Sequence, residues 1–140
     1  MIRAVLDCGV LVSAIGWGGN ARSCLDLAAS GQVSLFVTDE IWKEYADRIP
    51  AIVAAEQRDV DAQPVLAWLL TIAQFVQPAP LGKPRSRDTR DDPYLACALQ
   101  AGADVIVSND RDLLVLGKPF GVAILTPIQF LKFVRGATGN

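Results

Sequence analysis

The sequence of 140 residues contains no histidine, and this absence removes a class of chemistry. Histidine is the side chain that most often transfers protons near neutral pH and the most common metal ligand. Every catalytic mechanism in which an imidazole acts as the acid or base is therefore excluded. Clustered carboxylates in a chain without histidine point instead to a hard divalent cation with oxygen ligands.

Long apolar runs and paired cysteines are also lacking. The longest apolar stretch, residues 65–76, is interrupted by Thr71 and Gln74. It is far shorter than the roughly 20 residues of a membrane span. The N-terminus leads directly into strand-like sequence, unlike a signal peptide, so we expect a cytoplasmic protein with no membrane segment. The cysteines have no metal-ligand spacing and cannot all pair, which predicts buried, reduced thiols at Cys8, Cys24 and Cys97.

Positive charge is scarce overall. The net charge is −2, hydrophobic residues make up 51% of the chain and charged residues 20%. This composition is typical of a globular protein, and the length favours a single domain over residues 1–140. A globally basic, nucleic-acid-binding surface is not expected. One basic segment is nevertheless present, which alone would be interpreted as a solvated loop and carries Lys83, Arg85, Arg87 and Arg90.

Strand-like and helix-like segments alternate along the chain. Short apolar runs predict strands at residues 2–6, 33–37, 105–107 and 122–125. Helical spacing, caps and breakers predict helices at residues 20–31, from 38 or 39 onward, 64–76, 92–102 and from 126 onward. Such alternation favours an α/β fold with three layers, α/β/α, and a central, mainly parallel sheet of four to five strands.

Four acidic residues are predicted to meet at one edge of this sheet. Functional crevices in such folds lie beyond the carboxyl ends of the strands, where Asp7 and Asp110 are expected. Asp92 precedes the apolar stripe of its helix by one turn, so its carboxylate is expected to point inward. Glu44 lies on the border of the inner face of its own helix and can reach the same edge.

Each acid also has a purely structural interpretation. Asp92 before Pro93 suits a helix N-cap, Glu44 suits an ion pair with Arg48, and Asp110 suits a second cap. Asp7 is the hardest to explain this way, because it directly follows an apolar strand. Two like charges 4 Å apart cost about 4 kcal/mol at an effective dielectric constant of 20, so a bound dication would relieve a cluster of these acids.

Four stretches together resemble a PIN domain, and the resemblance covers essentially the whole chain. They are Val5 to Ala14, Asp39 to Tyr45, Arg87 to Ala96 and Val105 to Leu113. Within that superfamily the chain looks like the ribonuclease toxins of toxin–antitoxin systems, the VapC-like group. The resemblance implies an endoribonuclease that depends on one or two Mg²⁺ or Mn²⁺ ions and leaves 5′-phosphate and 3′-hydroxyl ends.

The resemblance also assigns roles to individual residues. It implies catalytic roles for Asp7, Glu44, Asp92 and Asp110, with metal bound by Asp7, Asp92 and Asp110. Ser108 is implied as a supporting hydroxyl, and Asp112 and Asp91 as weaker supporting acids. The basic segment would bind RNA phosphates through Lys83, Arg85, Arg87 and Arg90. Implied partners are the RNA substrate, a small antitoxin protein and a second copy in a homodimer.

One departure and three alternatives qualify this interpretation. The family commonly has asparagine two residues after its first acid, where this chain has Gly9. A catalytically silent PIN-like module that binds RNA or protein therefore stays open. A receiver-type phosphoacceptor is disfavoured, because it needs paired N-terminal acids and a lysine after a late strand. A haloacid-dehalogenase-type phosphatase is disfavoured as well, because Asp7 is not followed by a second acid at position 9.

Overall fold

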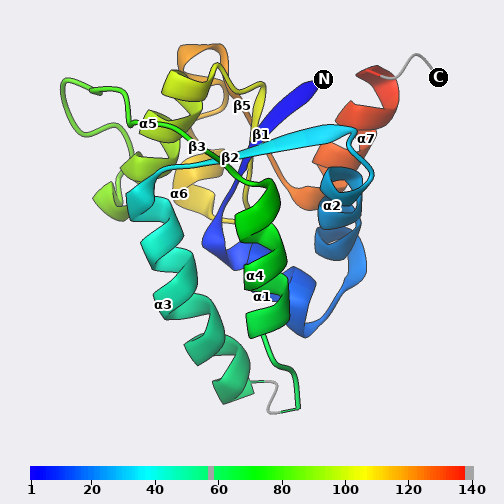
Figure 1. The fold of residues 1–140 in the computed structure, drawn as a ribbon. Coiled ribbons are helices and arrows are strands. Elements are labelled where there is room, and N and C mark those ends of the chain that lie inside the picture. Colours follow the sequence, from blue (N-terminus) through cyan, green and yellow to red (C-terminus); the bar gives the residue numbers. More distant parts are fainter. Residues whose placement is uncertain (57–58, 138–140) are drawn as a thin grey trace.

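The computed structural model describes residues 1–56 and 59–137 as an α/β domain with five parallel strands (Figure 1). The strands are β1 (Ile2–Leu6), β2 (Val33–Val37), β3 (Gln74–Phe75), β4 (Val105–Val107) and β5 (Ala123–Leu125). They lie in the order β3-β2-β1-β4-β5. The predicted α/β architecture is confirmed, with a sheet that is parallel throughout.

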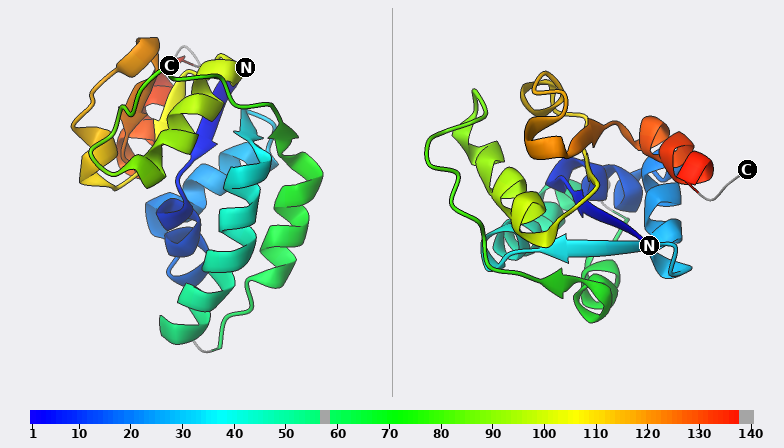
Figure 2. Two further views of the ribbon diagram at one scale, coloured as in Figure 1. Left: turned by 90° about the vertical axis from the view of Figure 1, so that its left-hand side faces the viewer. Right: turned by 90° about the horizontal axis from the view of Figure 1, so that it is seen from above.

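Helices connect the strands and flank the sheet (Figure 2). They are α1 (Cys8–Gly16), α2 (Gly19–Ala29), α3 (Asp39–Glu56), α4 (Gln63–Ile72), α5 (Asp92–Ala101), α6 (Arg111–Leu114) and α7 (Pro127–Ala137). Two 3₁₀ turns add η1 (Thr89–Asp91) and η2 (Pro119–Gly121). Helices α3 and α4 run side by side and extend away from the sheet (Figures 1 and 2). No described helix is both long and apolar enough to cross a membrane.

The central strands are buried on both faces. Consecutive residues Ala4, Val5 and Leu6 of β1 are buried, as is all of β4. Because successive side chains of a strand point to opposite faces, this pattern requires cover on both sides of the sheet. Helix α5 packs against β1, β2 and β4, and α7 packs against β4 and β5.

The three cysteines lie in this core, as predicted. Each is buried and free, and burial raises the pKa of Cys24 to about 11 and the pKa values of Cys8 and Cys97 to about 12. The thiolate is the reactive form of cysteine. These side chains therefore act as small apolar groups at neutral pH.

Three local predictions need correction. The helix expected over residues 64–76 ends at Ile72, because Ala73 is extended and the chain then pairs with β2 as β3. Asn20 does not cap α2, which begins at Gly19 after the positive-φ residue Gly18. Helical spacing in the sequence predicts Phe133 on the same face of α7 as Phe130 and Val134, but Phe133 is 38% exposed whereas those two are buried. Thr38 caps α3, since its Oγ1 accepts the N–H of Ile41 at 3.2 Å.

Candidate active site

The strand order reverses between β1 and β4, and the polar residues after these strands meet there. The N–H of Asp7 donates to the carbonyl oxygen of Val107 at 3.0 Å, which brings the two strand ends together. The buried Ser108 hydroxyl then donates to Asp7 Oδ2 at 2.7 Å and accepts the N–H of Asp110 at 2.9 Å. A crevice at such a reversal is where parallel α/β folds place their ligands.

A cavity of about 240 Å³ opens at this position. Its wall is formed by residues that follow β1, lie on α3, precede or form η1, lie on α5, and follow β4. Five carboxylates contribute to it, and the full lining is Asp7, Cys8, Gly9, Glu44, Arg48, Ile52, Asp88, Arg90, Asp91, Tyr94 and Asp110. The structure therefore brings Asp7, Glu44 and Asp110 together at the edge where the sequence predicts them.

Asp91 is the most constrained of these acids. Asp91 is 7% exposed, and its Oδ2 atom is buried without a hydrogen-bond partner among the described residues. Burial is the main cause that raises the pKa of Asp91 to about 7. A hydrogen bond to the Asp110 carboxyl and the charge of Asp110 raise this pKa further. A buried acceptor without a donor costs free energy unless a ligand satisfies it. A cation is the ligand that this oxygen suits.

Asp7 is held in a similar environment. Burial raises its pKa above the ordinary value, the Ser108 hydroxyl opposes this shift, and the charges of Asp110 and Glu44 add to it. Like charges at close range disfavour the ionised form of Asp7. Asp110 is ordered in turn, because its Oδ1 accepts the N–H of Asp112 at 2.9 Å and caps α6.

Asp92 does not follow the prediction that its carboxylate points into the cavity. Its carboxylate oxygens accept the backbone N–H of Ser86 at 2.8 Å and that of Arg85 at 3.1 and 3.3 Å. Asp92 therefore fixes the loop before η1, and Asp91 lines the cavity in its place. The physical reason is the register of α5, whose buried face carries Tyr94, Leu95 and Ala98, three, four and seven residues after Asp91.

A second group of acids overlaps the first. One oxygen from each of Asp88, Asp91 and Asp112 lies within 4.8 Å of the others. Asp88 and Asp91 also line the cavity, so the two groups are joined and Asp91 is their link. Asp88 is not among the site residues predicted from the sequence, although its spacing of three residues from Asp91 suits one 3₁₀ turn. Carboxylate oxygens are the donor set that Mg²⁺ and Mn²⁺ prefer, so the residues present fit such an ion.

Glu44 lies on the α3 side of the cavity and already has two partners. The buried Tyr94 hydroxyl donates to Glu44 Oε1, and Arg48 Nη1 lies 3.2 Å from Glu44 Oε2. Tyr94 OH also accepts the N–H of Cys8 at 3.2 Å. The Glu44–Arg48 ion pair suggested by the sequence is thus present, and both of its residues line the cavity.

The predicted basic segment divides into two parts. Arg87 and Arg90 reach acids of the site, with Arg87 Nη2 3.1 Å from Asp112 Oδ1 and Arg90 Nη2 2.8 Å from Asp88 Oδ2. The guanidinium of Arg85 instead donates to the carbonyl of Leu81 and lies over the ring of Phe120, 5.2 Å from its centroid. Lys83 is exposed on the same loop.

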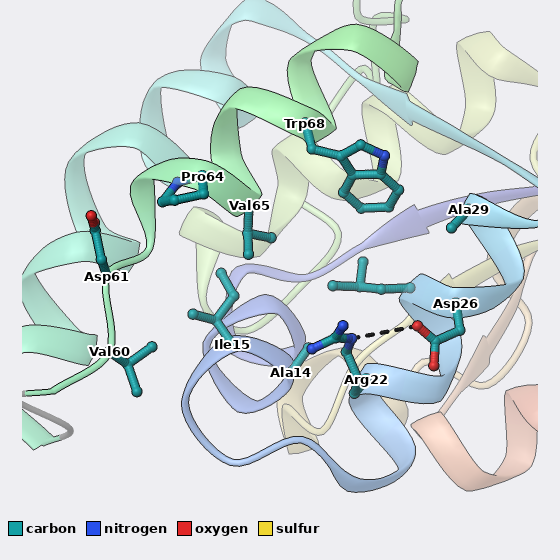
Figure 3. A pocket seen from close by; sticks show the side chains of 11 residues that line it. Ala14, Ile15, Arg22, Asp26, Ala29, Val60, Asp61, Pro64, Val65 and Trp68 are labelled. Carbon is teal, nitrogen blue, oxygen red and sulfur yellow. Dashed lines mark hydrogen bonds and ion pairs between the residues drawn. The ribbon is translucent and has the colours of Figure 1, made fainter.

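A different, apolar cavity of about 330 Å³ lies between α1, α2 and α4 (Figure 3). Ile15, Val65 and Trp68 project into it, and the exposed pair Arg22–Asp26 stands at its edge (Figure 3). Its acids are not clustered, since Asp26 pairs with Arg22 and Asp61 lies on the opposite wall. This cavity does not have the carboxylate set that hydrolysis with a metal requires.

Comparison with known proteins agrees with this geometry. Residues 3–112 match the family described as PIN domain. No curated protein matches the sequence significantly. The fold is similar to the crystal structure of PAE2754 from Pyrobaculum aerophilum, with a TM-score of 0.62 and 15% identity over 96% of this chain and 90% of that one. At this identity the structural likeness concerns the fold.

Proposed function

Because this chain belongs to the PIN-domain family, whose members are metal-dependent nucleases, we propose that it is an Mg²⁺- or Mn²⁺-dependent endoribonuclease. The acidic cavity between the ends of β1 and β4 is its active site. The observation that carries the proposal is the orphaned Asp91 Oδ2, buried beside Asp110 and Asp7 in a cavity lined by five carboxylates.

Each acid has a role in this proposal. Asp7, Asp91 and Asp110 would hold the ion, while Glu44 and Asp88 line the same cavity and complete its negative charge. This assignment replaces Asp92 with Asp91 as a ligand. When bound, the ion would polarise the scissile phosphate and lower the pKa of an attacking water molecule.

The protein's own groups prepare the cavity for this ion. Ser108 donates to Asp7 Oδ2 and so opposes the rise in the pKa of that carboxyl that burial causes. The backbone N–H of Asp112 donates to Asp110 Oδ1 and so orients that carboxylate. Such outer hydrogen bonds fix the direction of carboxylate ligands and raise metal affinity.

RNA is the substrate class that the surroundings support. Arg87 and Arg90 stand on the loop beside the acids, and Lys83 and Arg85 belong to the same exposed loop. Contacts from these cations to phosphates would make binding depend on salt concentration. Their contribution is to place the backbone of the RNA across the cavity.

The proposal is tested by RNA cleavage with Mn²⁺, Mg²⁺ or EDTA. We expect cleavage only with metal, products with 5′-phosphate ends, and loss of cleavage in Asp7→Asn and Asp91→Asn. Asp26→Asn is the matched control, since Asp26 is an exposed acid at the apolar cavity. Intact RNA under all conditions, together with no Mn²⁺ binding by calorimetry, would contradict the proposal and favour a silent binding module.

We further propose that the protein acts in the cytoplasm as the toxin of a toxin–antitoxin pair. A small antitoxin protein would inhibit it, and the active form would be a homodimer. Support comes from the resemblance of the whole chain to such toxins. Induced expression in a bacterial host should arrest growth for the wild type and not for Asp7→Asn, and sedimentation should give the mass of a dimer. Normal growth with a cleaving enzyme would remove the toxin role and leave the nuclease.

A further inference from the structure

Three of the four ion pairs found in the described residues involve acids of the cavity or of the overlapping Asp88, Asp91 and Asp112 group. They come from separate parts of the chain, with Arg48 on α3, Arg87 before η1 and Arg90 within η1. Their carboxylate partners are acids of the site, namely Glu44, Asp112 and Asp88 respectively. The three cations are therefore the internal counter-ions of the acidic cluster.

These arginines remain accessible while they are paired. The side chains of Arg48, Arg87 and Arg90 are 55%, 88% and 81% exposed, whereas their acidic partners are only 24–29% exposed. Each guanidinium thus covers its carboxylate from the solvent side. Exposed pairs of this kind contribute little to stability, so they can exchange partners easily.

A second concave region extends the site on the side of the arginines. It has a volume of about 580 Å³ and is lined by Glu40, Ile41, Glu44, Arg48, Thr89, Arg90 and Pro93. Glu44, Arg48 and Arg90 belong to both this region and the acidic cavity. The two regions therefore share a wall that carries Glu44 and two arginines.

From this arrangement, and resting on the proposed function, we infer that Arg48, Arg87 and Arg90 exchange partners when the site is loaded. The neighbouring carboxylates of Glu44, Asp88 and Asp112 would turn part of their interaction from the guanidinium groups to a divalent cation held by Asp7, Asp91 and Asp110. The released guanidinium groups then bind the RNA phosphates that flank the one held in the acidic cavity. Planar guanidinium groups suit phosphate oxygens as well as carboxylates, so the exchange keeps each arginine hydrogen-bonded.

The exchange makes cation binding and RNA binding favour each other. By linkage, the factor by which a cation improves RNA affinity equals the factor by which RNA improves cation affinity. Removing an arginine has opposite effects on the two ligands taken separately. The cation loses a competitor and binds more tightly, while RNA loses a phosphate contact and binds more weakly.

The first experiment measures Mn²⁺ affinity by calorimetry without RNA for Arg48→Ala, Arg87→Ala and Arg90→Ala. We expect each to bind Mn²⁺ about two- to fivefold more tightly than the wild type, the range that corresponds to an exposed ion pair. Arg22→Ala is the matched control, because Arg22 forms an exposed pair with Asp26 four residues later on α2. It should leave Mn²⁺ affinity unchanged.

The second experiment measures anisotropy of a short labelled single-stranded RNA in EDTA and in Ca²⁺, with a gel to confirm that the RNA stays intact. The wild type and Arg22→Ala should gain RNA affinity with Ca²⁺, and the three variants should gain several-fold less. Unchanged or weaker Mn²⁺ binding in all three variants would overturn the exchange, since arginines that only position the acids or only contact RNA give that result.

Failure of the exchange is distinguishable from failure of the proposed function. If the wild type cleaves RNA with Mn²⁺ while the three variants bind Mn²⁺ like Arg22→Ala, the exchange is wrong and the nuclease stands. If the wild type binds no Mn²⁺ at all, both are wrong.

Discussion

The hydroxyl of Tyr94 donates a hydrogen bond to Glu44 Oε1 and accepts one from the N–H of Cys8. Tyr94 is 1% exposed and lies on α5, Glu44 lies on α3, and Cys8 follows Asp7 at the end of β1. One phenol therefore connects three separate parts of the chain that line the cavity. Tyr94 acts as a positioning residue for Glu44, because it fixes one oxygen of that carboxylate from the inside of the protein.

Tyr94→Phe tests this role. Loss of a hydrogen-bonded partner next to a metal site commonly lowers metal affinity or activity by about 10–100-fold, and we expect a loss in this range. Tyr45→Phe is a close control, since Tyr45 is also buried and its hydroxyl donates to the carbonyl of Leu6 rather than to an acid. The free energy of unfolding should be about 1–3 kcal/mol lower in both variants than in the wild type, because each variant leaves a buried backbone group unpaired.

The measurements are Mn²⁺ titration, RNA cleavage and urea unfolding of the two variants. The stability losses should be similar, while only Tyr94→Phe loses Mn²⁺ affinity and cleavage rate. Equal activity losses in both variants would mean that the hydroxyl of Tyr94 matters for packing alone.

Asp91 and Asp92 are adjacent, and the structure gives them different tasks. Asp91→Asn removes a carboxylate from the cavity and should reduce cleavage by more than about 100-fold, beyond the effect of an outer hydrogen bond. Asp92→Asn keeps an oxygen that can accept the Ser86 N–H, so cleavage should stay within a few-fold of the wild type. Steady-state cleavage of one RNA by both variants makes the comparison. The reverse order of activities would restore Asp92 as the ligand.

The metal-free protein should become less stable as pH rises from 5 to 8. The pKa of Asp91 is about 7 in the folded chain against an ordinary value of 3.8, so between these values the folded state binds more protons than the unfolded state. Stability then falls with rising pH, and the loss is complete above about pH 7. Asp7 has a raised pKa for the same reason, burial, and adds to this slope.

Thermal unfolding in EDTA at several pH values measures this slope. Asp91→Asn should flatten it and raise the melting temperature at pH 8, since the uncharged amide avoids the buried negative charge. Saturating Mn²⁺ should also stabilise the wild type at pH 8, because a ligand that binds only the folded state shifts the equilibrium by mass action. A slope of the opposite sign between pH 5 and 8 would contradict the proposed environment of Asp91.

The sequence predicts the frame of this site better than its details. Asp7 and Asp110 follow buried strands, so their meeting depends only on the edge rule for parallel sheets, and the structure agrees. The prediction that the Asp92 carboxylate points into the cavity is wrong because the register of α5 places Asp91 there instead. The apolar stripe of Leu95, Ala96 and Leu99 matches the buried face only in part, since Leu95 and Ala96 are buried and Leu99 is half-buried.

Other features lie outside what local patterns show. Strand β3 has two residues, Gln74 and Phe75, and both are exposed, so no apolar alternation marks it. Its existence depends on pairing with β2, which is a tertiary effect. Likewise, the bond between Tyr94 and Glu44 joins residues 50 positions apart. No local pattern in the sequence identifies such a pair.

Gly9 is the position at which the chain departs from the family pattern, and its surroundings make the departure testable. Gly9 lies in the first turn of α1 and lines the acidic cavity. A Cβ atom built there would have no heavy atom within 4 Å, and its φ is not in the positive range that disfavours side chains. Gly9→Asn should therefore fold normally, with a small gain in helix stability of a few tenths of a kcal/mol.

The asparagine side chain would place an amide beside Asp7, where its oxygen can add a neutral ligand or its NH₂ can orient a carboxylate. We expect tighter Mn²⁺ binding and faster RNA cleavage by Gly9→Asn. Gly9→Ala is the control, because it gives the same relief of backbone entropy without the amide. If Gly9→Ala and Gly9→Asn gain equally, rigidity of α1 limits the site. If neither changes Mn²⁺ affinity or cleavage, the absence of asparagine does not weaken the site, and the remaining carboxylates suffice.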